Sequence, residues 1–273
     1  MNFILKNYRK YIPYNIRVRI QDAKEWLSDR RLYIVLNKKR AAGMKNYTFN
    51  NDGLISNHVV PFMDNELFLS SLDSGLSDLG KDIHDAYFRI YMACALAKYA
   101  LALKGDYVEC GVFKGSFSKA ICEYIDFGNV DKKFYLFDTF EGIPTDNTML
   151  VEAVKIESTN AHYAESGYYE FVKNKFSMYK NVSVVKGVVP DVLSTVNIEN
   201  VSMLSIDMNN AVPEVEATKY FYEKLVPGGI ILYDDYAYSE KYKAQRVALD
   251  ELADELGVSI ITLPTGQGLL IKS

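Results

Sequence analysis

The stretch YVECGVFKGSFSKAICEY, residues 107–124, joins a short apolar run to a turn with two glycines and then to a segment with helical spacing. The apolar run is typical of a buried strand, and we expect a helix from Ser116 to Tyr124. Gly111 and Gly115 let a ligand approach the backbone of the turn, and the N-terminus of the following helix favours an anionic group. The stretch therefore predicts a strand, a turn and a helix with a binding site at the turn.

Similar apolar runs recur from about residue 74 onward, and helical patterns separate them. We expect strands within YVECGV, KFYLFD, VSVVKG, VSMLSID and GIILYDD, and two more, close in sequence, within VSIITL and QGLLIKS. Helices are expected at about residues 76–103, 116–124, 213–225 and 241–256. Apolar strands that alternate with helices predict an α/β fold with a doubly wound, mostly parallel, Rossmann-like sheet and an antiparallel pair of strands at one edge.

The chain length of 273 residues suits one large α/β domain with an extension. We assign residues 74–273 to the domain and residues 1–73 to a basic N-terminal extension that serves as an arm, a lid or an oligomerisation element, alternatives that the sequence leaves open. Residues 1–45 carry twelve Lys or Arg against three Asp or Glu, a net charge of +9 in a chain whose total is −4. Such a segment is suited to lie on an anionic membrane surface, to grip a partner subunit in a homo-oligomer, or simply to face water. The acidic remainder offers no basic track for nucleic acid.

Location and redox state follow from what the sequence lacks. No apolar run reaches the roughly 18 residues of a membrane span, and the N-terminus has no signal-peptide pattern. We expect a cytoplasmic protein, with peripheral membrane contact through the basic extension as the alternative. The three cysteines are an odd number without a C-x-x-C pair, which predicts that all three are reduced.

Acidic residues stand at the ends of the apolar runs: Glu109, Asp138, Asp207, Asp234 and Asp235. Because ligands of doubly wound sheets bind outside the carboxyl ends of the strands, we expect these side chains to meet at one site. The first turn is neither G-x-G-x-x-G nor a P-loop, which counts against an ordinary dinucleotide and against ATP. It suits a ligand with a carboxylate, an amine and a ribose but no phosphate, and Asp138 is placed to accept hydrogen bonds from ribose hydroxyls. These features point to S-adenosylmethionine.

Six segments together resemble the macrocin O-methyltransferase family of class I S-adenosylmethionine-dependent methyltransferases. They are GDYVECGVFKG, YLFDTFEGIP, VVKGVVPDVL, LSID, LVPGGIILYDDY and PTGQGL, and the likeness runs from about residue 76 to the C-terminus. The resemblance implies a Rossmann-like methyltransferase domain that methylates a sugar hydroxyl of a glycoside, polysaccharide or natural product, with a small-molecule or glycan acceptor and with magnesium as a second cofactor.

The resemblance also implies a role for individual residues on the cofactor side. Glu109 and Gly111 would flank the methionine part of S-adenosylmethionine, in the turn that Gly115 closes. Ser116 or Ser118 would bind its carboxylate and Asp138 its ribose. The adenine would lie along Lys186, Gly187 and Val188.

On the acceptor side, the resemblance implies that Asp207, Asp234 and Asp235 bind magnesium, since adjacent carboxylates tolerate one another when a hard dication neutralises them. Asp207 would also act as the general base, with His162 as the substitute base, and Tyr236 would form a wall or a hydrogen-bonding group. The chain departs from the family pattern D-x-D at Asn209, where an amide replaces the second acid and weakens the expected metal affinity. Glu214 either compensates or opens the next helix.

Two alternatives stay open. The first keeps S-adenosylmethionine but uses an amine or a phenolic hydroxyl as the acceptor, without metal. The second is a cofactor-binding scaffold that has lost catalysis, for which Asn209 is the best support and the three aspartates are the argument against.

Overall fold

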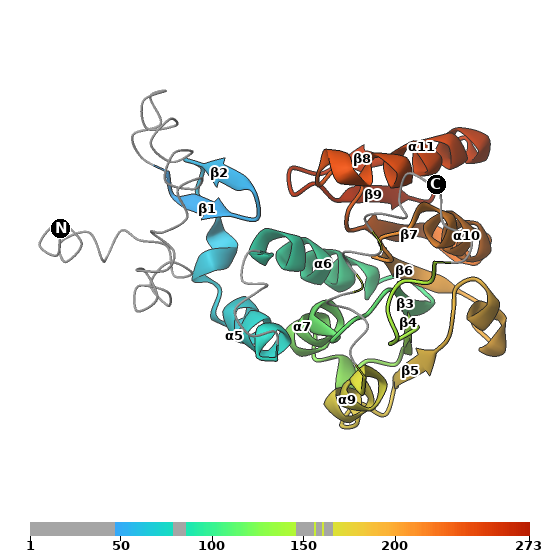
Figure 1. Ribbon diagram of the computed structural model, residues 1–273. Coiled ribbons are helices and arrows are strands. Elements are labelled where there is room, and N and C mark those ends of the chain that lie inside the picture. The colour runs from blue at the N-terminus through green and yellow to red at the C-terminus, as the bar shows by residue number, and fades with distance from the viewer. Residues whose placement is uncertain (1–46, 79–85, 146–155, 157–159, 161–165) are drawn as a thin grey trace, which may run out of the picture.

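The computed structural model describes residues 47–78, 86–145, 156, 160 and 166–273, and in these residues the main element is a seven-stranded sheet (Figure 1). Its strand order is β5-β4-β3-β6-β7-β9-β8. The strands are β3 (Asp106–Cys110), β4 (Phe134–Asp138), β5 (Val182–Lys186), β6 (Val201–Ile206), β7 (Leu225–Tyr233), β8 (Ile261–Thr262) and β9 (Gly268–Ile271). The first five are parallel, whereas β9 pairs antiparallel with both β7 and β8. The predicted α/β sheet with an antiparallel edge is confirmed.

Helices cover both faces of this sheet (Figure 1). They are α5 (Glu66–Leu76), α6 (Tyr87–Ala100), α7 (Ser116–Tyr124), α9 (Tyr168–Phe176), α10 (Ala211–Tyr222) and α11 (Lys243–Leu256), with short 3-10 helices η2 (Pro61–Asp64), η3 (Phe127–Asn129), η4 (Asp191–Thr195) and η5 (Glu240–Tyr242). Successive strand residues point to opposite faces, so Tyr107 packs in the core with α5, α6, α7 and α9, and Val108 packs in the core with α10 and α11. Two buried layers therefore hold the sheet from both sides.

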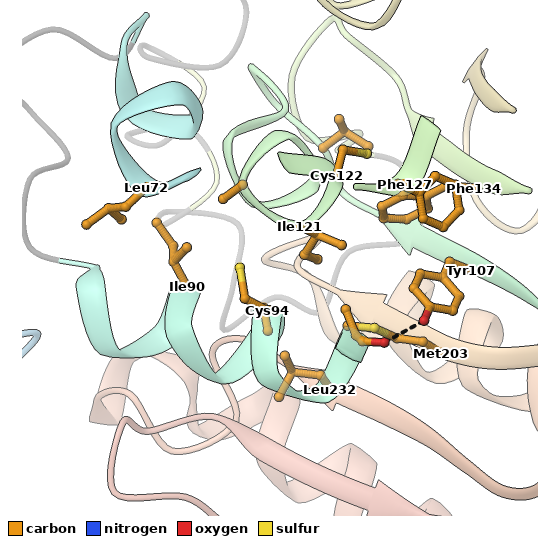
Figure 2. Packing of buried hydrophobic residues seen from close by; sticks show 14 of the residues in the cluster. Leu72, Ile90, Cys94, Tyr107, Ile121, Cys122, Phe127, Phe134, Met203 and Leu232 are labelled. Atoms are coloured by element: carbon orange, nitrogen blue, oxygen red, sulfur yellow. Dashed lines mark hydrogen bonds between the residues drawn. The ribbon is translucent and has the colours of Figure 1, made fainter. Parts of the chain in front are cut away.

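The first of these cores fixes the helix pair α6 and α7 against the sheet (Figure 2). Ile90 and Cys94 of α6 lie near Ile121 and Cys122 of α7, and all four side chains are buried. At the end of α6 the Tyr107 hydroxyl donates a hydrogen bond of 2.5 Å to the carbonyl oxygen of Ala97. The three cysteines are buried thiols without a disulfide, as the sequence predicted.

The segment before α6 packs on the same core. A hairpin of β1 (Phe49–Asn51) and β2 (Leu54–Ser56) leads through η2 into α5, and Phe49, Phe62, Phe68 and Leu72 are all buried in that core. The expected division at residues 73 and 74 falls inside α5. The single helix expected over residues 76–103 is wrong, because α5 ends at Leu76 and α6 begins only at Tyr87. The basic residues 1–45 lie outside the described residues.

Candidate functional site

A cavity of about 310 Å³ opens at the carboxyl ends of β3, β4, β6 and β7. It lies at the point where the strand order reverses: the chain goes from β3 to β4 and β5 on one side and continues through β6 and β7 on the other. Ligands of doubly wound sheets bind at this switch point. Its lining includes nine residues expected at the site from the sequence: Glu109, Gly111, Ser116, Asp138, Gly187, Val188, Asp207, Asp234 and Asp235.

Three other expected residues lie outside that lining. Gly115 packs against the ring of Phe176, with φ +72° at the N-terminus of α7. Ser118 is fully buried and donates a hydrogen bond to the carboxylate of Glu109. Lys186 pairs with Glu141 at 2.5 Å between Nζ and Oε1. Ser118 thus supports Glu109, and of the three residues expected beside the adenine, Gly187 and Val188 line the cavity and Lys186 does not.

The strand β3 and the helix α7, which one turn joins, contribute a carboxyl and a hydroxyl to the lining: Glu109 and Ser116. Glu109 is only 4% exposed, and its burial raises its pKa to about 8, an effect that Ser118 opposes and that Asp138 and Asp234 reinforce. The Ser116 Oγ is buried and has no hydrogen-bond partner among the described residues. Because Ser116 is the first residue of α7, this orphaned hydroxyl lies where backbone N–H groups favour an anion.

Asp138, at the end of β4, holds two loops together. Its Oδ2 accepts hydrogen bonds from the backbone N–H groups of Val112 (2.6 Å) and Phe113 (2.9 Å), and its Oδ1 accepts one from Phe140 (2.7 Å). Phe113 and Phe140 have φ of +49° and +55°, which is uncommon for residues other than glycine. The carboxylate therefore stabilises two left-handed residues that line the cavity.

The acidic end of the cavity consists of Asp207 after β6 and of Asp234 and Asp235 after β7. Burial raises the pKa of Asp207 well above its usual range, and the nearby Asp234 and Asp235 add to the shift. Asn209, with φ +56°, donates from Nδ2 to Oδ1 of Asp207 at 3.1 Å. The side-chain amide of Asn209, which stands where the family pattern has an acid, thus holds the carboxyl of Asp207 in place.

Arg89, which no sequence motif indicated, reaches this end of the cavity from α6. Its Nη1 lies 2.6 Å from Oδ2 of Asp234, and its Nε lies 2.9 Å from Oδ1 of Asp52. The other oxygen of Asp234, Oδ1, accepts a hydrogen bond from Nε2 of Gln267 at 3.0 Å. A single charge within the apolar run YFRIYMACALA was the signal that could have revealed Arg89.

Glu214 does not line the cavity but supports it. Its Oε1 accepts hydrogen bonds from the backbone N–H of Met208 (3.2 Å) and from Nε2 of Gln245 (2.8 Å). It therefore fixes the loop after Asp207 and lies in the first turn of α10, which is the simpler of the two roles expected for it.

The carboxylates do not fit the magnesium site that the resemblance implied. Among the residues that the structure describes, no three His, Cys, Asp or Glu side chains are arranged to hold a metal ion. Both oxygens of Asp234 are engaged by protein donors, and the amide nitrogen of Asn209 faces Asp207.

Aromatic side chains form part of the wall. Tyr236 is not part of the cavity lining, and its hydroxyl donates a hydrogen bond to Asp250 of α11, so its expected role as a wall is wrong. Tyr168, Tyr238 and Tyr242 line the cavity instead. His162, the expected substitute base, lies outside the described residues. No helix in the described part of the chain has the length and apolar character needed to cross a bilayer.

Comparisons with known proteins show which family the chain resembles in sequence. The family model described as macrocin-O-methyltransferase (TylF) matches residues 91–258. The mycinamicin III 3''-O-methyltransferase of Micromonospora griseorubida is 27% identical over 165 residues, 57% of this chain and 63% of that enzyme, so the chain matches less than two thirds of this relative.

Two solved structures share the fold. The O-methyltransferase NovP superposes with a TM-score of 0.60 at 21% identity over 70% of this chain and 81% of its own. The calicheamicin methyltransferase CalS11 gives a TM-score of 0.56 at 16% identity over 78% of this chain and 94% of its own. Since the family model covers more than half of the residues, the chain belongs to the macrocin-O-methyltransferase (TylF) family.

Proposed function

We propose that this protein is an S-adenosylmethionine-dependent O-methyltransferase whose acceptor is a sugar hydroxyl of a glycoside, polysaccharide or natural product. The observation that carries the proposal is one cavity with two chemically different ends. We call the side of β3 and α7, with Glu109 and the orphaned hydroxyl of Ser116, the cofactor end, and the side after β6 and β7, with the carboxyl of Asp207, the acceptor end. The family and the activity of the mycinamicin relative support the same reaction and acceptor class.

Each chemical group of S-adenosylmethionine has a suitable partner at the cofactor end. Glu109 would hold the ammonium group, and Ser116 with the first N–H groups of α7 would hold the carboxylate. The ribose would lie beside Asp138, and the adenine beside Gly187 and Val188, which line the same cavity. When bound, this cofactor supplies a sulfonium methyl group with a good leaving group.

The acceptor end would orient a hydroxyl and remove its proton. As the acceptor oxygen bonds to the methyl carbon and the sulfur–carbon bond breaks, Asp207 in its ionised form would take the hydroxyl proton and later release it to solvent; its raised pKa makes that carboxylate a stronger base. The backbone of Asp207 donates a hydrogen bond of 2.9 Å to the Cys110 carbonyl, which ties this base to the strand that carries Glu109. Tyr168 and Tyr238 line the cavity, and the face of a sugar ring can pack on their aromatic rings. Positioning of this kind supplies much of the rate in displacement reactions.

Other parts of the assignment stay predictions. Magnesium assistance, implied by the family resemblance, does not fit the bonds that Asp234 and Asn209 make, so turnover should continue in the presence of a chelator, and loss of turnover would contradict this. A cytoplasmic location, a homo-oligomer and membrane contact through residues 1–45 rest on the sequence alone.

The test combines calorimetric titration with S-adenosylhomocysteine and a transfer assay with S-adenosylmethionine against glycosides, nucleotide sugars, catechols and amines, with methylated product detected by mass spectrometry. Methylation of a sugar supports the proposal. Methylation of only a phenol or an amine replaces it by the first alternative. Binding of S-adenosylhomocysteine without transfer to any acceptor favours the scaffold, and absence of binding overturns both enzyme assignments.

A further inference from the structure

We propose that the guanidinium of Arg89 is the resident cation of the acidic end of the cavity, where it takes the place of a metal ion on Asp234, and that the hairpin of β1 and β2 fixes it there. The inference deepens the proposed function, on which it rests, because it assigns the charge-neutralising group of the acceptor end. Arg89 would be a positioning residue that acts through Asp234.

The first observation is the geometry of the guanidinium. Its Nη1 and Nε bond to Asp234 and Asp52 at 2.6 and 2.9 Å, so one planar cation bridges two carboxylates. The side chains are 13% exposed for Arg89, 7% for Asp234 and 0% for Asp52. The ring of Tyr238 stacks on the guanidinium carbon at 4.4 Å. A buried ion pair with this many contacts is fixed in position rather than mobile in solvent.

The second observation is that protein donors already bond to both carboxylate oxygens of Asp234, where a metal ion would have to bind. Asp234 directs Oδ2 at Arg89 and Oδ1 at Gln267, whose side chain is buried. Magnesium binds carboxylate oxygens in a near-ideal octahedron and keeps several water molecules. A dication at Asp234 would lie against the positive charge of Arg89, whose Nη1 is 2.6 Å from Oδ2 of Asp234. Arg89 and a metal ion therefore compete for the same carboxylate.

The third observation links the cation to the hairpin. Asp52 accepts a hydrogen bond at Oδ2 from the backbone N–H of Arg89 (2.9 Å) as well as the guanidinium at Oδ1, and Asn51 accepts one from the N–H of Tyr87 (3.0 Å). The N-cap residue before α6 is Ala86, which makes no side-chain hydrogen bond to the helix. The hairpin thus caps the helix that carries Arg89 and sets the direction of its side chain. Arg89 and Asp52 lie outside residues 91–258, which the family model matches. The site therefore extends beyond that segment.

The test is a Mn²⁺ titration of the cofactor-free protein followed by electron paramagnetic resonance, which needs no turnover. We compare the wild type with Arg89→Met, which removes the charge and keeps much of the volume, and with Arg89→Lys, which keeps the charge. We expect no Mn²⁺ binding at Asp234 in the wild type or in Arg89→Lys. In Arg89→Met we expect a new site, at least tenfold tighter than any wild-type binding, that disappears when Asp234→Asn is added.

A second variant covers the case in which Arg89→Met does not fold. The pair Arg89→Gln with Asp52→Asn replaces the buried ion pair by neutral amides and leaves Asp234 without its cation, and it should gain the same Mn²⁺ site. Wild-type Mn²⁺ binding that depends on Asp234 and weakens in these variants would overturn the proposal, because Arg89 would then orient a metal ligand. A folded variant that gains no Mn²⁺ site would also overturn it. S-adenosylhomocysteine affinity, measured on the same samples, reports separately on the proposed function.

Discussion

A Cβ atom placed on Gly111 would lie 1.8 Å from the carbonyl oxygen of Asp207. The two residues follow β3 and β6, the neighbouring strands at which the sheet order reverses. Gly111 also has φ +90°, a conformation that side chains disfavour. The turn at the cofactor end and the carboxyl at the acceptor end are therefore in backbone contact, and only glycine permits this.

We expect Gly111→Ala to lower the free energy of unfolding by about 3 kcal/mol or more, since steric overlap with the Asp207 backbone adds to the cost of a positive φ. S-adenosylhomocysteine affinity should fall with it. Urea unfolding and calorimetry measure the two effects. The control is Gly257→Ala, because Gly257 has a similar φ of +68° but no atom within 4 Å of the added Cβ. That control should lose only about 1 kcal/mol; equal losses in both variants would show that the contact with Asp207 is unimportant.

Asp138→Asn should destabilise the protein by about 2 kcal/mol, because an amide can accept at one side only and would turn its NH₂ group toward backbone donors. The carboxylate now accepts from Val112, Phe113 and Phe140. Thermal unfolding would measure the loss, with the exposed Asp131→Asn as the control. A change within the error of that control would mean that the two loops hold their left-handed residues without the carboxylate.

Binding of S-adenosylhomocysteine should release a proton below pH 8. Glu109, whose pKa burial raises to about 8, holds its proton at pH 7 in the cofactor-free protein, and an ammonium group beside it would favour the carboxylate. Affinity should therefore rise as the pH increases from about 6 to 8. Calorimetry in two buffers with different ionisation enthalpies gives the number of protons released, and Glu109→Gln should release none from this position. An unchanged proton count in that variant would contradict the assignment.

The same pKa shift of Glu109 predicts how stability depends on pH. The folded state keeps the proton up to about pH 8, whereas the unfolded chain loses it near 4.5, the ordinary pKa of a glutamate. The stabilising contribution of this proton is fully present below pH 4.5 and is lost as the pH rises through 8. Urea unfolding of the cofactor-free protein between pH 5 and 8 should show a decline that is shallower in Glu109→Gln. Parallel curves for the two proteins would rule out the shift.

The sheet and the acidic strand ends could be predicted because each depends on local sequence: an apolar run and the residue that follows it. Arg89 could not, since its partner Asp234 is 145 residues away and the pair exists only after β7 lies beside α6. Asp52 was missed for the same reason, because its hydrogen bonds to Arg89 cross 37 residues. Tyr236 was misassigned because a residue after a strand can turn to either side, and here it turns to Asp250. The local sequence pattern thus predicted which acidic side chains line the cavity. Long-range pairing decided which hydrogen bonds and ion pairs these carboxylates make.

Asp207→Asn should lower kcat by about 10²- to 10⁴-fold, the usual contribution of a positioned general base, and leave S-adenosylhomocysteine affinity unchanged. The reason is that Asp207 lies at the acceptor end, where its Oδ1 is already held by Asn209 at 3.1 Å, so the amide keeps the volume and loses the base. Single-turnover methyl transfer and calorimetry separate the two quantities. Asn209→Ala is the matched control: it removes the orienting hydrogen bond and keeps the carboxyl, and it should cost about tenfold in kcat or less. An Asp207→Asn protein that transfers methyl groups at the wild-type rate would move the base to another residue of the cavity.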